Sequence, residues 1–216
     1  MKGLLIKDMR ILLRQKMTLL IIVLLGVFMS MNGGNAGFSL GYMMVVSATL
    51  VVTTISYDYF ERGMSFMFTL PISKKSYVLE KYLLAVLVEI CLAAFAVVIQ
   101  AVGILLGNPA DWMVFLITGV SCFVTAMIII ALYIPVYIKC GPEKSRVAIF
   151  IVLGVIAAVT FLAAKVKPVQ DALMVLVEAL SKLSAAQITA IGVAVFVMLM
   201  AASIGISIKI MEKKEF

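Results

Sequence analysis

Histidine is absent from this sequence of 216 residues, and charged residues make up only 13% of it. Without histidine, the chain lacks the commonest general base and the commonest neutral metal ligand in proteins. Its three cysteines, Cys91, Cys122 and Cys140, are too far apart to form a CxxC metal pair or a recognisable disulfide framework. We therefore expect no catalytic residue, no metal and no cofactor in the chain itself.

Hydrophobic residues make up 64% of the sequence, and its mean hydropathy is +1.20. Such a chain cannot cover a soluble core with a polar surface, so lipid must be its main solvent. The formal net charge of +7 does not indicate nucleic-acid binding, because the cations fall between long apolar runs instead of clustering on one face. We predict a single membrane domain over residues 1–216.

Six apolar runs approach the length of about 20 residues that a helix needs to cross a bilayer. The predicted fold is thus all-α and polytopic, with six transmembrane helices. The runs cover residues 17–31, 38–57, 82–106, 113–138, 147–164 and 188–208.

The basic residues are distributed unequally between the two sides of these runs. Fifteen of the 18 Lys and Arg residues lie in the N-terminal segment, the second and fourth connections, and the C-terminal tail. Positive charges near helix ends are retained in the cytoplasm. Both termini are therefore predicted to be cytoplasmic, in a multi-pass protein of the cytoplasmic membrane.

Two segments outside the runs are predicted to be amphipathic helices. In Gly3–Lys16, the cations Lys7, Arg10 and Arg14 share one helical face, which suits a helix in the inner headgroup layer, although an ordinary basic flank of the first span is equally compatible. In the fifth connection, after Pro168, apolar residues recur three or four positions apart with polar residues between them, as in an extracytoplasmic amphipathic helix lying across the outer mouth.

The second connection, Asp58–Lys81, is the longest cytoplasmic segment. Four of its apolar residues recur at i, i+4, i+7 and i+8, so a short helix would present them on one face beside charged neighbours. The apolar residues are Phe60, Met64, Met67 and Phe68, and the charged ones are Asp58, Glu61 and Arg62. An exposed face of this kind indicates a protein-docking surface or a patch resting on lipid. Pro71 should end this helix and Ser73 should cap the next.

Polar residues inside the apolar runs are candidates for a translocation path. Glu89 and Gln100 share one stripe of the third run, and a carboxylate in the bilayer is costly enough to suggest a path or a proton site. Alternatively, Glu89 pairs or hydrates near the inner surface, since Lys81 is about 12 Å away along the helix. Ser121 and Thr125 line one face of the fourth run, either on the path or as a polar packing seam.

Three stretches resemble the permeases of type-2 ATP-binding-cassette (ABC-2) exporters. They are MKGLLIKD at the start, DYFERG at 58–63, and TLPISKKSYVLEKYL at 69–83. Within that family the sequence is most similar to bacterial permeases that export phenol-soluble modulins, which are amphipathic peptides. The resemblance implies an interfacial N-terminal helix, six spans, and a coupling helix between spans two and three that seats Asp58–Phe68 in a cytosolic ABC ATPase. It also implies a pore of two permease copies, as a homodimer or a heterodimer.

The chain contains no GxxxxGK[ST] loop to cradle phosphates, so ATP and Mg²⁺ would be bound by the partner ATPase. Two other classes of protein remain open. An ion-coupled carrier working without an ATPase would need ionisable residues near the midplane, and only Glu89 fits. An intramembrane enzyme is the weakest reading, because no paired acidic or nucleophilic motif occurs within the runs.

Overall fold

The computed structural model describes residues 2–31, 36–60, 63–105, 112–165 and 184–214, and the regular structure in these ranges is helical. The helices are α1 (Lys2–Arg14), α2 (Lys16–Met31), α3 (Ala36–Tyr59), α4 (Gly63–Met67), α5 (Lys74–Leu105), α6 (Trp112–Lys165) and α8 (Ala185–Glu212). The predicted all-α class is confirmed for the described ranges. The amphipathic helix predicted after Pro168 lies outside them.

Four of the described helices, α3, α5, α6 and α8, are long and apolar enough to cross a membrane. The count becomes five if α1 and α2, which meet at a bend of 68°, form one broken span. A polytopic membrane protein is therefore supported, whereas the arrangement in six spans stays a prediction.

Helix α6 consists of two limbs. Gly141 has φ 76° and ψ 174°, a conformation that glycine adopts readily and other residues rarely, and Pro142 follows it. The limbs, residues 112–140 and 142–165, overlap the fourth and fifth predicted runs. Pro135 lies inside the first limb, where the backbone stays helical.

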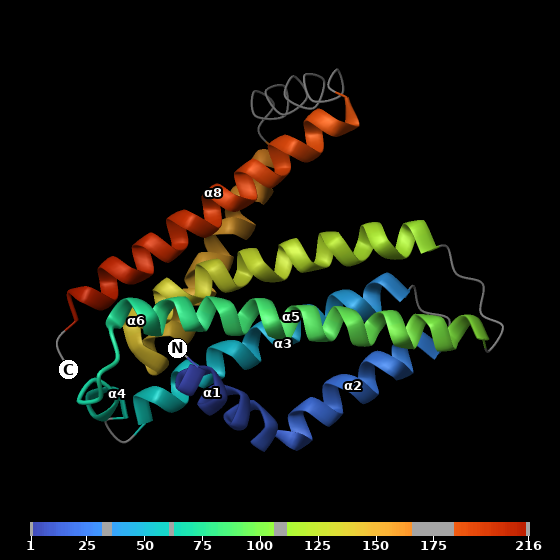
Figure 1. Cartoon of the computed structure of the whole chain (residues 1–216). Coiled ribbons are helices and arrows are strands. Elements are labelled where there is room, and N and C mark those ends of the chain that lie inside the picture. Colours follow the sequence, from blue (N-terminus) through green and yellow to red (C-terminus); the bar gives the residue numbers. More distant parts are fainter. Residues whose placement is uncertain (1, 32–35, 61–62, 106–111, 166–183, 215–216) are drawn as a thin grey trace.

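Helix α3 forms the centre of the bundle and packs against α2, α5 and α6 (Figure 1). Of the apolar window of α3, 56% is buried. The corresponding share for α8 is 11%, and α8 lies at the edge of the bundle against α5 and α6.

Helices α2 and α3 approach closely at Gly26, where a Cβ atom would lie 2.5 Å from the Met43 sulfur. Figure 1 shows α4, the start of α5 and the C-terminal end of α8 gathered at one end, called here the α4 end.

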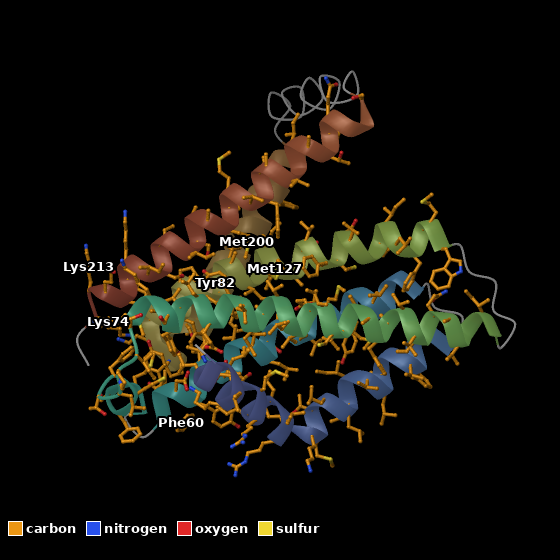
Figure 2. The ribbon with its side chains drawn as sticks, viewed as in Figure 1. Phe60, Lys74, Tyr82, Met127, Met200 and Lys213 are labelled. Atoms are coloured by element: carbon orange, nitrogen blue, oxygen red, sulfur yellow. The ribbon has the colours of Figure 1, made fainter. Side chains whose placement is uncertain are left out.

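Helix α8 is held to its neighbours by polar as well as apolar contacts. The Tyr82 hydroxyl on α5 lies 2.6 Å from Ser203 Oγ and 3.0 Å from Ser207 Oγ on α8, and Ser203 donates a hydrogen bond to the Ala131 carbonyl on α6. Figure 2 shows Tyr82 with Met127 and Met200 where these three helices meet. Hydroxyl contacts of this type stabilise helix packing where lipid provides no alternative partner.

Candidate functional site

The segment between α3 and α5, residues 60–73, is called here the α4 segment. It contains the five-residue helix α4 and then a turn through Pro71. The predicted cap of α5 is confirmed, because Ser73 Oγ accepts a hydrogen bond from the Ser76 amide at 3.1 Å. Helix α5 therefore runs without interruption from the end of the α4 segment into the bundle.

The predicted exposed face of the α4 segment is wrong in part. Met64 and Met67 are only 3% and 7% exposed and pack in the core, and the half-buried Phe68 ring meets Tyr77 edge-on at 6.0 Å. The spacing indicated that these side chains share a helical face, but the face that carries Met64 and Met67 packs against the core. Glu61 and Arg62 lie outside the described residues.

Three other side chains form the outer surface of this segment, and we call them the apolar patch: Phe60, Phe66 and Leu70, which are 68%, 71% and 47% exposed. Figure 2 shows Phe60 at the α4 end of the bundle. Its ring lies 6.5 Å from that of Tyr57, and Tyr57, Phe66 and Leu70 all line a recess of about 540 Å³ beside the start of α1. The patch thus adjoins a concave surface, which Phe66 and Leu70 help to line, and Phe60 lies beside the lining residue Tyr57.

A group of buried charges lies directly behind the patch, and we call it the Lys81 cluster. It consists of Lys7 and Asp8 on α1, Asp58 on α3, and Glu80 and Lys81 on α5. Lys81 and Asp8 are fully buried, while Asp58 and Glu80 are 6% and 2% exposed. Buried charges are tolerated only when they are paired and hydrogen-bonded.

Lys81 holds the cluster together. Its ammonium forms an ion pair with Asp8, lies 2.8 Å from Asp58 Oδ2 and 3.9 Å from Glu80, and donates a hydrogen bond to Thr54 Oγ1 at 3.2 Å. Three helices that are distant in sequence are thereby joined at one point.

Lys7 and Tyr77 complete the surroundings of the carboxylates. Lys7 pairs with Asp58 and lies 3.1 Å from Asp8, and the Tyr77 hydroxyl donates to Asp58 at 3.0 Å. Lys7 is therefore turned into the protein, whereas Arg10 and Arg14, predicted to share its lipid-facing side, are exposed. Asp58 was predicted to lie beside an exposed docking face. It is instead buried behind the apolar patch, where it pairs with Lys7 and Lys81.

The end of α8 is joined to the same end of the bundle. Lys74 donates to the carbonyls of Glu212 and Lys214 at 3.2 and 2.7 Å, and Figure 2 shows Lys74 close to Lys213. Lys214 donates in turn to the Tyr59 hydroxyl and the Ile138 carbonyl at 2.9 and 2.8 Å. Burial lowers the pKa of the Lys214 ammonium below that of a free lysine.

The four candidate path residues do not share one environment. Glu89 is fully buried and accepts a hydrogen bond from Ser47 at 2.6 Å, and Gln100 is 9% exposed. Ser121 and Thr125 are exposed and donate to backbone carbonyls one turn earlier in their own helix. The Glu89 carboxyl is partnered by Ser47, and the Lys81 ammonium is engaged by Asp8 and Asp58.

Within the described ranges, Glu89 has one carboxylate oxygen that accepts no hydrogen bond, and no three side chains among His, Cys, Asp and Glu are placed to hold a metal ion. A buried carboxyl of this kind is costly in an apolar interior, which keeps Glu89 among the candidate functional residues.

A comparison with protein families places the chain in a known class. The family model described as ABC-2 family transporter protein matches residues 3–212, almost the whole chain. The chain belongs to the ABC-2 transporter family. No curated protein and no solved structure matches it. Membership makes this ABC-2 protein a membrane component of an ABC transporter, a class of transporter that works with an ATPase.

The sequence did not predict the Lys81 cluster of this ABC-2 protein. One signal was present, since Asp8 is the only acidic residue among the first 57 and lies in an otherwise basic segment. A single acidic residue among basic ones is typical of a residue with a specific cationic partner. Which lysine it pairs with depends on the folding of α5 against α1.

Proposed function

We propose that this chain is the permease subunit of an ATP-driven exporter and that the apolar patch of its α4 segment binds the cytosolic ATPase. The exposure of the patch is the observation that supports this proposal most strongly. Two aromatic side chains that are about 70% exposed, one of which lines a recess, are typical of protein-docking surfaces, where aromatic anchors supply most of the binding energy.

The proposed orientation follows from the charges at the α4 end. Lys75, Lys139, Lys209 and Lys213 are all exposed in the described parts of the chain that meet there. The positive-inside rule assigns such an end to the cytoplasm, here that of a bacterial cell. The two limbs of α6, together with α2, α3, α5 and α8, then make six spans with both termini cytoplasmic.

Movement of the patch would be transmitted through the Lys81 cluster. Pulling or pushing the α4 segment displaces Asp58 and the start of α5, and the buried ion pairs connect both to α1. Closely packed interiors shift between discrete arrangements instead of deforming gradually. Closure of the ATPase would therefore tilt α3 and α5 together and open the path outward.

The proposed transporter also contains a second permease copy and carries a peptide. A second permease copy, identical or related, would cover the largely exposed α8, of whose apolar window 11% is buried. The cargo is an amphipathic peptide, a substrate class that the resemblance to exporters of phenol-soluble modulins implies and that flexible methionine side chains would accommodate. ATP and Mg²⁺ belong to the partner subunit.

Transport in reconstituted vesicles tests the proposal. The chain and its ATPase are placed together in proteoliposomes, with a fluorescent amphipathic peptide on the ATPase side. We expect the peptide to cross only when ATP and Mg²⁺ are present, and a non-hydrolysable ATP analogue to stop it. Transport that proceeds without the ATPase would contradict the proposal.

The burial of Glu89 favours one second candidate, an ion-coupled carrier, because a protonated carboxyl beside Ser47 could release its proton on a conformational change. For the exporter we expect Glu89→Gln to keep at least about half of ATP-driven transport, since glutamine resembles the protonated acid in shape and hydrogen bonding. Peptide uptake driven by a proton gradient without ATP, and lost in Glu89→Gln, would favour the carrier.

A further inference from the structure

The bend between α1 and α2 encloses an apolar pocket distinct from the α4 segment. It has a volume of about 220 Å³. Its walls come from α1 (Leu12, Leu13), α2 (Ile22), α3 (Leu50) and α5 (Leu87, Cys91). Leu13 and Leu87 are 60% and 37% exposed, so the pocket opens on the outer surface of the bundle, while Ile22 and Leu50 close its floor. We call it the α1–α2 pocket.

Water is a poor occupant of this pocket, because a site without polar partners stays dry. Cavities of about 150 Å³ lined by apolar side chains take up a molecule as large as benzene. A pocket of about 220 Å³ therefore holds a segment of a flexible hydrocarbon chain. In a membrane protein, the hydrocarbon at hand is the acyl chain of a lipid.

The charges beside the opening identify the class of lipid. Arg10 and Arg14 are both exposed, are four residues apart on α1, and lie next to the pocket residue Leu13. Lys16, also exposed, follows at the bend. The single acidic residue of α1 and α2 is Asp8, which is fully buried and paired with Lys81. Exposed cations thus adjoin the pocket residue Leu13 along α1 and at the bend, and neither helix has an exposed carboxylate to neutralise them.

We propose that the α1–α2 pocket binds one acyl chain of an anionic phospholipid whose headgroup phosphate is held by Arg10 and Arg14. The lipid fills the angle of 68° between α1 and α2 and so holds α1, with Asp8, against α5. This site does not depend on the ATPase, and its test can fail while the proposed function stands.

Native mass spectrometry measures the headgroup preference. The delipidated protein is mixed with equal amounts of phosphatidylglycerol and phosphatidylcholine that have the same acyl chains. We expect phosphatidylglycerol to be retained about tenfold over phosphatidylcholine, the size expected for cations near an anionic headgroup. The double variant Arg10→Ala/Arg14→Ala should lose this preference, and Lys209→Ala/Lys213→Ala, which removes two exposed cations from α8, should keep it.

Cys91 reports the location of the lipid. In the variant Cys122→Ser/Cys140→Ser it is the remaining thiol, and phosphatidylglycerol should slow its reaction with a small maleimide about tenfold. Leu13→Trp, which narrows the pocket, should reduce lipid retention, whereas Leu83→Trp on an exposed part of α5 should not. Equal retention of both lipids, or an unchanged Cys91 rate with phosphatidylglycerol bound, overturns the proposal. So does protection of Cys91 by an amphipathic peptide and not by lipid.

Discussion

Phe60→Ala/Phe66→Ala is expected to abolish ATP-driven transport while the permease stays folded. Both rings are about 70% exposed, so their removal takes little from the core. At a protein interface, each aromatic anchor contributes about 2 kcal/mol or more, which for two rings corresponds to a loss of affinity of several hundredfold or greater. Binding of the ATPase to permease in nanodiscs, measured together with the melting temperature, checks this result.

Two control variants distinguish docking from stability. Phe28→Ala removes a ring that is 65% exposed on α2, away from the patch, and should leave ATPase affinity unchanged. Met64→Ala removes a side chain that is 3% exposed, and a buried Met→Ala change typically lowers stability by about 2–5 kcal/mol. The account fails if the double alanine variant melts as early as Met64→Ala or binds the ATPase as tightly as the native protein.

Lys81→Met is expected to destabilise the permease by about 3–5 kcal/mol, the usual effect of removing one partner from a buried ion pair. The carboxylates of Asp8 and Asp58 would keep Lys7 as a shared cation but lose the fully buried ammonium between them. Unfolding in detergent, followed by the fluorescence of the single tryptophan, Trp112, measures the change.

Lys75→Met provides the matched control on the same helix. The Lys75 side chain is 66% exposed, and it lies 3.5 Å from a Glu212 carboxylate that is 47% exposed. Exposed pairs of this type contribute about 0–1 kcal/mol. Adding Asp8→Asn and Asp58→Asn to Lys81→Met should recover part of the lost stability, because two of the three buried carboxylates that faced the Lys81 ammonium are then neutral. Equal stability of Lys81→Met and Lys75→Met would show that the Lys81 cluster does not stabilise the fold.

The helices could be predicted from the sequence because lipid imposes a simple rule on the length of an apolar run. The third run was placed at 82–106, and α5 occupies Lys74–Leu105. Its first turns are more polar than a membrane span, and the cap at Ser73 extends the helix beyond the apolar residues. Hydropathy therefore located the apolar body of α5 more closely than its first turns.

The interior of the α4 segment was less predictable, because periodicity tells which residues share a helical face but not which face is covered. Met64 and Met67 belong to one buried core with Leu4 of α1, Ile55 of α3 and Tyr77 of α5, so their burial depends on helices that are distant in the sequence. The Lys81 cluster has the same origin, since it joins Asp8 to a lysine 73 positions later. Contacts of this range are set by tertiary folding and leave only a weak trace in composition.

The most direct test of the account is the protection of a thiol at position 66. Phe66→Cys is made in a background in which the three native cysteines are serine, and inside-out membrane vesicles are treated with a membrane-impermeant maleimide. We predict rapid labelling that stops when the ATPase is added, whereas Lys16→Cys at the α1–α2 bend continues to react. A cysteine at position 66 that is inaccessible from the cytoplasmic side, or that reacts equally fast with and without the ATPase, would contradict the proposal that the apolar patch is where the ATPase binds.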